Sequence, residues 1–295
     1  ATARELWPKL FSGKEPPADA HAVIKAVLDE RAKHHPDNDT VIALATRDLG
    51  ETTAFVKARG FVEVPDDPLE VTPWPEFSRG VAVASCNPPG FLEKGLKTFY
   101  YISPTPADWK PERVESFFRE NNDDMLQEMT IHEAMPGHFL QLALSNRFKA
   151  PTLLRGIGFS GTFVEGWAVY AEQLMAEAGY GGPEVRMQQL KMRLRMIINA
   201  IIDQKIHTAG MSEKEAIEMM MNDGFQEEGE AVGKWKRAQL SSTQLATYFV
   251  GNAEVNDIRA AWEKKHPDGK LRELHDQMLG HGSPAPKYVK ELLGL

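Results

Sequence analysis

The sequence predicts a mainly α-helical protein with one small β-sheet. Three observations predict this fold class: long stretches with helical apolar spacing from residue 111 onward, short β-branched and aromatic runs between residues 61 and 104, and shorter helical stretches before them. With 295 residues, 42% of them hydrophobic, the chain can bury a core without a metal or a disulfide. We expect one compact domain with three regions, 1–60, 61–104 and 105–295.

The first region, 1–60, predicts a helical packing layer. The stretch "HAVIKAVLDERAKHH" (21–35) places Ala, Val, Ile and Leu on one helical face. The segments "KEPPAD" (14–19) and "HHPDND" (34–39) interrupt the helices, because proline and turn-forming residues end regular structure.

The second region, 61–104, predicts the small sheet. Its apolar runs are short, rich in β-branched and aromatic residues, and separated by proline and glycine. The expected strands are "FVEV" (61–64), "LEVTPW" (69–74), "GVAVAS" (80–85) and "KTFYYIS" (97–103).

The third region, 105–295, predicts helices almost throughout. Ser212 and Glu215 have the spacing of a capping box, and "GYGG" (179–182) is typical of a helix end. The expected helical stretches are 111–149, 160–178, 183–208, 212–222, 226–237, 252–264 and 268–279.

The composition excludes two classes of protein. No apolar run approaches the roughly 18 residues of a membrane span, so we expect no such span. The net charge is −8 and the only dense basic cluster is "KWKR" (234–237), so we expect no nucleic-acid partner. The single cysteine, Cys86, cannot form an internal disulfide. The chain begins at Ala1 without an initiator Met, which fits a processed, trimmed or truncated polypeptide, and we favour a secreted or periplasmic location after processing over a cytoplasmic one.

The stretch "HEAMPGH" (132–138) is a candidate metal site with unusual spacing. Zinc-binding histidines on one regular helix are four residues apart, whereas His132 and His138 are six apart and would be rotated by about 240°. Pro136 lacks the N–H that would bond the carbonyl of His132, and Gly137 permits backbone angles that other residues avoid. We therefore expect a break at 135–137 that brings the two imidazoles together.

A zinc hydrolase also needs a third ligand and a general base. Glu133, directly after the first histidine, is the candidate base, and Glu165 in the next helix is the candidate third ligand. Glu172 lies two turns beyond Glu165 on the same face. Glu128, four residues before His132, is expected to accept the second N–H of that imidazole.

These residues also have structural interpretations. Thr162 and Glu165 match a capping box, so Glu165 need not bind a metal. The segment "HDQMLGH" (275–281) has the same histidine spacing without Pro-Gly, and we interpret it as helix capping and surface polarity. Spacing alone leaves metal binding open.

The sequence resembles a bacterial family known as domain of unknown function 885 over roughly residues 80–290. Its members resemble helical zinc metallopeptidases of the broad thermolysin-like group, similar to carboxypeptidase Taq and the angiotensin-converting dipeptidases. Five segments carry the resemblance, in order: "HEAMPGHFLQ" (132–141), "VEGWAVYAEQL" (164–174), "IIDQKIHTAGMS" (201–212), "TQLATYFVG" (243–251) and "LRELHDQMLGHGSPAP" (271–286).

The resemblance implies Zn²⁺ on His132, His138 and Glu165, with Glu133 as the base. It gives weight to His207 and Tyr248 as candidates that stabilise the oxyanion of a tetrahedral intermediate, with Asp203 one helical turn from His207 to orient it. Two weaker candidates for the same role are Tyr170 and Arg195.

We therefore expect a zinc-dependent metallopeptidase that cleaves amide bonds in short peptides, with the fold of a multi-helix half-cleft. Family members are generally about twice as long, so a missing N-terminal half or a second chain is an expected partner. The alternative is a helical interaction or assembly module with a structural or vestigial metal site. An exposed apolar face on "MRLRMIINAII" (192–202) would favour that alternative.

Overall fold

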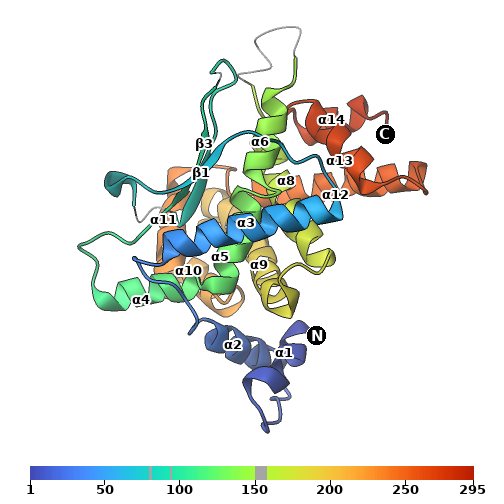
Figure 1. Ribbon diagram of the computed structural model, residues 1–295. Coiled ribbons are helices and arrows are strands. Elements are labelled where there is room, and N and C mark those ends of the chain that lie inside the picture. Colours follow the sequence, from blue (N-terminus) through green and yellow to red (C-terminus); the bar gives the residue numbers. More distant parts are fainter. Residues whose placement is uncertain (80–81, 94, 150–157) are drawn as a thin grey trace.

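The computed structural model describes residues 1–79, 82–93, 95–149 and 158–295, and it is mainly helical with one small sheet (Figure 1). The predicted fold class is confirmed at this level. The helices form the body of the molecule, and the sheet lies against one side of it (Figure 1). Among the described helices, none combines the length and the apolar character that a membrane span requires.

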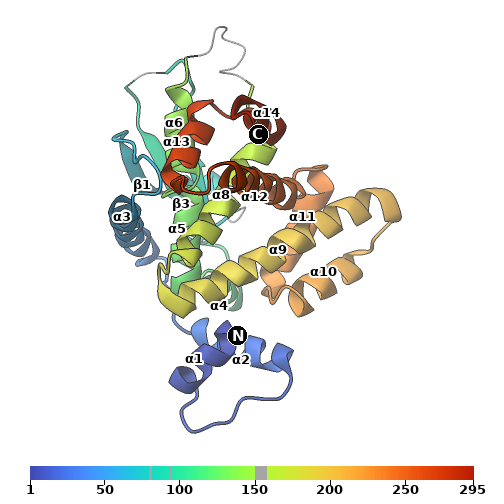
Figure 2. The same cartoon turned by 90° about the vertical axis from the view of Figure 1, so that its right-hand side faces the viewer.

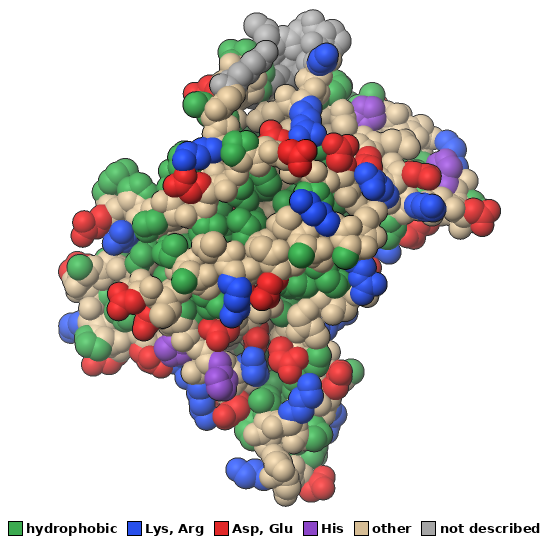
Figure 3. Space-filling model, viewed as in Figure 1, with side chains coloured by type: hydrophobic (Ala, Val, Ile, Leu, Met, Phe, Trp, Pro, Cys, Tyr) green, Lys and Arg blue, Asp and Glu red, His purple; other side chains and the backbone are tan. Residues whose placement is uncertain are grey.

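The first three helices belong to two different packing clusters. Helices α1 (Thr2–Leu10) and α2 (Ala20–Arg31) pack on each other and on Met187, and they project from the rest of the molecule (Figure 1). Helix α3 (Val41–Arg59) packs instead on the main core. Hydrophobic side chains gather on both sides of α3 on the face that Figure 3 shows.

The sheet has three strands in the order β1-β3-β2. The central strand β3 (Thr98–Ile102) pairs in parallel with β1 (Leu69–Pro73) and antiparallel with β2 (Ala84–Asn87). A short 3₁₀ helix, Glu76–Ser78, follows β1. Alternate β3 side chains, Tyr100 and Ile102, are fully buried under the helices. Because β3 is the central strand, β1 and β2 are the two edge strands of the sheet.

The prediction of a strand at 61–64 is wrong. This segment forms an irregular connection after α3, although Val62 still packs into the main core. The backbone N–H of Glu63 donates to Asp276 of a later helix at 2.7 Å, so it is not available to a neighbouring strand. Residues 80 and 81 of the predicted strand 80–85 lie outside the described residues.

The predicted helical stretch 111–149 contains three separate helices. The described residues are interrupted directly after it, at residue 150. The three helices are α4 (Pro111–Glu120), α5 (Asp123–Glu133) and α6 (His138–Asn146). The side chain of Asn122 caps α5 by accepting from the N–H of Met125 at 3.2 Å. The boundary between α5 and α6 falls within the histidine motif.

Helix α8 (Gly161–Glu177) is followed by α9 (Gly182–Ala209), α10 (Glu213–Asn222) and α11 (Glu228–Leu240). Ser160 caps α8, so the interpretation of Thr162 and Glu165 as a capping box is wrong. The capping box of Ser212 and Glu215 is confirmed. Figure 2 shows α9 running obliquely away from α5 toward α10 and α11.

The chain ends in α12 (Thr247–Lys265), α13 (Leu271–Gly280) and α14 (Pro286–Leu292). Helix α12 begins five residues before its predicted start at 252, and α14 was not predicted. Helix α8 contributes Phe163, Trp167 and Tyr170, all fully buried, to the main core, and it packs on α5, α6, α9 and α12. The candidate ligands on α5, α6 and α8 are thus held by a close-packed core.

Candidate metal centre

The predicted break in the histidine motif is confirmed. Helix α5 ends at Glu133, the peptide bond between Met135 and Pro136 is cis, and α6 begins at His138. The N–H of Gly137 donates to the carbonyl of Ile131 at 2.9 Å. A Cβ on Gly137 would lie 1.8 Å from the carbonyl oxygen of His132, so only glycine fits there.

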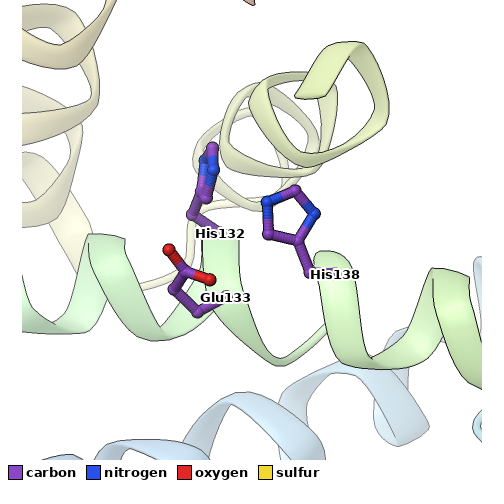
Figure 4. Close-up of side chains that lie close together, drawn as sticks. All are labelled: His132, Glu133 and His138. Atoms are coloured by element: carbon purple, nitrogen blue, oxygen red, sulfur yellow. The ribbon is translucent and has the colours of Figure 1, made fainter. Parts of the chain in front are cut away.

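The break brings the two imidazoles together. The ring centroids of His132 and His138 are 4.7 Å apart and the ring planes are inclined by 84°. Figure 4 shows both rings on the same side of the α5–α6 break, with the carboxylate of Glu133 beside them. Donor atoms of these three residues lie within 4.8 Å of one another. The six-residue spacing is therefore compatible with a shared ion.

Glu165, near the start of α8, completes a three-donor set. Its Oε2 lies 3.4 Å from Nε2 of His132 and 3.5 Å from Nε2 of His138, and this oxygen is buried without a hydrogen-bond partner among the described residues. These separations exceed the ordinary 2.7–3.2 Å of an N–H···O bond. Donors about 2.0–2.1 Å from one tetrahedral zinc ion are separated by roughly 3.3–3.4 Å. The two separations from Oε2 therefore match those of a ligand set more than those of a hydrogen-bonded cluster.

The electrostatics of Glu165 also favour a charged ligand. Burial opposes the negative charge, but His132 and His138 outweigh burial and hold the pKa of Glu165 below its ordinary value. Its side chain is 18% exposed, compared with 6% for His132, although Oε2 itself is buried. An anionic oxygen next to two imidazoles is a donor set that zinc accepts.

Glu133 lies between the candidate ligands and the sheet edge. Its Oε2 accepts a hydrogen bond of 2.9 Å from the backbone N–H of Cys86 in β2. Cys86 itself is a poor nucleophile, because burial raises the pKa of its thiol well above the ordinary value and Glu133 adds to that effect. The carboxylate of Glu133 is thus fixed beside the histidines without being hydrogen-bonded to them.

Glu172, not Glu128, accepts the second N–H of the first imidazole. Nδ1 of His132 lies 2.6 Å from Oε1 of Glu172, which leaves Nε2 directed at Glu165. The expectation for Glu128 is therefore wrong. The carboxyl group of Glu128 is fully buried and lies beside Glu172, to which it donates a hydrogen bond when protonated. Burial and the neighbouring Glu172 charge raise the pKa of Glu128 well above its ordinary value, which keeps it protonated.

Tyr248 lies at the site as predicted. Its ring centroid is 6.3 Å from that of His132, and its hydroxyl accepts from Nη2 of Arg237 at 3.1 Å and from Nε2 of Gln244 at 3.4 Å. Burial, together with the charge of Glu165, raises the pKa of Tyr248, so the phenol stays protonated at neutral pH.

His207 and Asp203 have structural partners away from the candidate ligands. Nε2 of His207 donates to the carbonyl of Ser241 at 2.8 Å, beyond the end of α11. Asp203 accepts from the N–H groups of Thr243 and Ala246, and its Oδ1 is 3.7 Å from His207, too far for a hydrogen bond. Asp203 therefore fixes the loop that precedes α12 and does not orient His207 for catalysis.

Comparison with known proteins identifies the family. Residues 1–293 match the family described as "Bacterial protein of unknown function (DUF885)". The chain belongs to this family. The match extends well beyond the segment 80–290 that carries the resemblance in the sequence. None of the curated proteins compared with the chain matches it.

Two solved structures resemble this DUF885 protein. A "putative lipoprotein of unknown function" from Shewanella oneidensis is 37% identical, with a TM-score of 0.86, and the match covers 100% of this chain and 53% of that one. A "putative lipoprotein" from Colwellia psychrerythraea is 20% identical, with a TM-score of 0.82, covering 99% of this chain and 48% of that one; it shows the fold alone. The DUF885 chain thus spans about half the length of these relatives.

Three further residues of this DUF885 protein depart from the predictions. His275 is fully buried rather than at the surface: Nδ1 donates to the carbonyl of Phe61 at 2.5 Å, and Nε2 accepts from the hydroxyl of Tyr170 at 2.8 Å. Tyr170 therefore points away from the candidate ligands, about 140° around α8 from Glu165. Arg195 is bound to Glu120 of α4 and not to the histidine cluster.

Sequence reasoning missed two features of the site. The N–H of Cys86 that holds Glu133 is a backbone group and has no side-chain signal. Arg237, which donates to Tyr248, belongs to the basic cluster "KWKR" (234–237), which we considered only as a phosphate-binding face. That cluster carries Lys234 and Arg237 three residues apart, on one helical face.

Proposed function

We propose that this protein is a zinc-dependent hydrolase that cleaves amide bonds in short peptides. The observation that carries the proposal is the position of Glu165 Oε2, 3.4 and 3.5 Å from the two imidazole nitrogens. Two histidines and one glutamate are an established ligand set of catalytic zinc, and they leave a coordination position open. Bound zinc would polarise the scissile carbonyl and lower the pKa of a water.

Glu133 is the proposed general base. It follows the first histidine directly, and its carboxylate reaches the space between the histidines and β2. In this role it accepts a proton from the attacking water and returns it to the leaving amine.

Tyr248 is the proposed stabiliser of the oxyanion. Arg237 and Gln244 both donate to the phenol oxygen, so the hydroxyl hydrogen remains free to point elsewhere. A protonated phenol beside the candidate ligands suits a developing negative charge on the carbonyl oxygen. We do not assign this role to His207, because its Nε2 is hydrogen-bonded to backbone carbonyls.

Strand β2 is the proposed docking edge for an extended peptide. The N–H of Cys86 points away from β3 and donates to Glu133, which places this edge of the sheet beside the candidate base. A substrate strand that pairs with this edge would lie along the histidine cluster. The helices and this edge would then form one wall of a cleft, the proposed half-cleft.

A second candidate function is a helical interaction module. An apolar cavity of about 540 Å³ lies between α9 and the start of α12, and Ile197, Ile201, Phe249 and Val250 contribute to its lining. Phe249 and Val250 are 42% and 43% exposed and line this cavity together with the two isoleucines, and a contiguous exposed apolar surface can mark an interaction site. A module of this kind would bind a helical partner equally well with and without metal.

Because the relatives are described as lipoproteins, we also propose a location outside the cytoplasm.

The decisive test is metal analysis of protein purified without chelators. The proposal predicts one zinc ion per chain, and it predicts that Glu165→Ala abolishes both zinc retention and peptide cleavage. The matched control is Glu177→Ala, on the same helix but paired with Arg259 on the surface, which should retain zinc and activity. Full peptide cleavage by metal-free protein would refute the proposal.

A further inference from the structure

A buried ionic cluster lies between α4, α9 and α11. Glu120, the last residue of α4, accepts from Lys191 at 2.9 Å and from Arg195, both on α9. On α11, Glu230 lies 3.4 Å from Nζ of Lys234, and it is 3.6 Å from Arg195. The side chains of Lys191, Arg195 and Lys234 are 6%, 11% and 10% exposed, so solvent screens their charges weakly.

Positive charge is in excess in this cluster. Lys191, Arg195 and Lys234 face the carboxylates of Glu120 and Glu230, Glu172 acts on Arg195 from the metal-site side, and Arg237, one turn after Lys234, adds a fourth cation, so four cations meet three carboxyl groups. Arg237 donates to Gln244 at 2.8 Å and to Tyr248, both uncharged, and within the described ranges no carboxylate pairs with it. Buried charges are normally matched, because an unpaired one costs several kcal/mol.

Two observations favour the binding of an additional anion at this cluster. Nε of Arg195 is buried and has no hydrogen-bond partner among the described residues, although guanidinium N–H groups are strong donors. Burial, reinforced by the charges of Arg195 and Arg237, lowers the pKa of Lys234 to about 8 even though Glu230 attracts its charge. An additional negative group would relieve both.

The cluster adjoins the candidate metal centre. Arg237 donates to the hydroxyl of Tyr248, whose ring lies 6.3 Å from that of His132 by centroid distance. Glu230 is 31% exposed and Tyr248 is partly exposed, so solvent reaches the cluster at Glu230 and its contact with the candidate metal centre at Tyr248. Arg237 and Tyr248 therefore connect the cluster to the side of the candidate metal centre that His132 occupies.

We propose that Arg195, Lys234 and Arg237 form a subsite for the C-terminal carboxylate of the substrate. With this subsite, the protein removes residues from the C-terminal end of short peptides. This inference rests on the proposed hydrolase function. The C-terminal carboxylate is the anion that every unmodified peptide carries, and Arg and Lys N–H groups bind it with charge-assisted hydrogen bonds. An acidic side chain near the chain end presents the same chemistry, so the test separates the two sources.

The first test compares three N-acylated peptides on the zinc-loaded protein: a free acid, its C-terminal amide, and an amide whose last residue is glutamate. We expect kcat/KM for the free acid to exceed that for its amide by roughly 10- to 100-fold, the range that a hydrogen bond to a charged group supports. Equal cleavage of the acid and amide would overturn the subsite. Cleavage of the Glu-ending amide as fast as the free acid would overturn its assignment to the chain end.

The second test uses matched lysine variants. Lys234→Met should bring the acid-to-amide ratio close to one, whereas Lys234→Arg, which retains the charge, should preserve most of the ratio. Lys214→Met is the control, because that side chain is 83% exposed and lies on α10. If the ratio survives in Lys234→Met protein that is shown to be folded by circular dichroism, the subsite is refuted.

A binding measurement separates this inference from the proposed function. Calorimetric titration of zinc-loaded Glu133→Gln protein with an N-acyl amino acid and with its amide should give tighter binding of the acid, and Lys234→Met should abolish the difference. Selective binding without any peptide cleavage by the wild-type protein would refute the hydrolase but support the subsite. Cleavage with equal binding of acid and amide would refute the subsite but leave the hydrolase in place.

Discussion

Gly166 of α8 and Gly251 of α12 are in backbone contact. A Cβ on Gly251 would lie 2.0 Å from the carbonyl oxygen of Thr162 and 2.8 Å from Cα of Gly166. The candidate ligand Glu165 directly precedes Gly166, and Tyr248 lies three residues before Gly251. This crossing therefore sets the distance between the candidate ligands and the candidate oxyanion stabiliser.

Gly251→Ala is expected to force α8 and α12 apart. We expect the free energy of unfolding to fall by about 1–3 kcal/mol, the usual cost of overpacking, in urea titrations monitored by circular dichroism. Gly50→Ala is the matched control, because a Cβ on Gly50 in α3 would meet no atom within 4 Å. That variant should gain roughly 0.5–1 kcal/mol from helix propensity. Equal effects of the two substitutions would show that the crossing has room for a side chain.

Glu133→Gln is expected to separate metal binding from catalysis. The amide can still accept from the N–H of Cys86, so the local structure should persist, but it cannot take a proton from water. We expect zinc content to stay at one per chain while kcat falls by roughly 10²- to 10⁴-fold. Zinc analysis and peptide cleavage on the same preparation check this. Loss of zinc in this variant would make Glu133 a ligand and not the base.

Tyr248→Phe is expected to lower kcat with little change in KM. The phenol hydroxyl is proposed to act on the oxyanion, which exists only after attack, so its removal should cost roughly 10²- to 10³-fold in kcat. Tyr170→Phe is the control, since that hydroxyl bonds His275 in the core. It should change stability but not kcat, and a similar fall in both variants would contradict the assignment of Tyr248.

His275 is expected to make the fold sensitive to acid. Burial lowers its pKa from 6.5 to about 4 in the folded protein, so between these values the unfolded chain binds the proton and the folded chain does not. The contribution of His275 is complete above pH 6.5 and is lost as the pH falls toward 4, by up to about 3 kcal/mol. Urea titrations at pH 7 and pH 5 on wild type and His275→Gln test this. The variant should lose less stability on acidification; parallel losses would be inconsistent with a neutral buried histidine.

Local chemistry explains which parts of the site the sequence predicts. Pro136 and Gly137 act on the backbone of the motif that contains them, so the break and the approach of His132 to His138 follow from residues within one turn. The strands were predicted from local composition as well, because β-branched and aromatic residues favour extended backbone. The exception is 61–64, where the apolar residues pack into the core without a neighbouring strand.

Contacts between distant segments were not predictable in this way. Which carboxylate reaches Nδ1 of His132 depends on the rotation of α8 against α5, and the structure selects Glu172 over Glu128. His207 is held by the carbonyl of Ser241, 34 residues away, which no spacing rule relates to it. The ionic cluster of Glu120 with Lys191 and Arg195 likewise forms only when α4 meets α9.

The interruption between α5 and α6 has a consequence beyond the histidines. Inside a continuous helix each carbonyl accepts from the N–H four residues later, and none remains for a neighbouring element. The carbonyl of Pro136 is released from that ladder and accepts from Nε1 of Trp167 at 2.9 Å. Trp167 follows Glu165 by two residues, so one bond fixes the position of α8 along α5 and α6. Two histidines four residues apart on one continuous helix could also face one ion. Such a motif would lack the hydrogen bond between Pro136 and Trp167, and with it this link to α8, the helix that supplies the third donor.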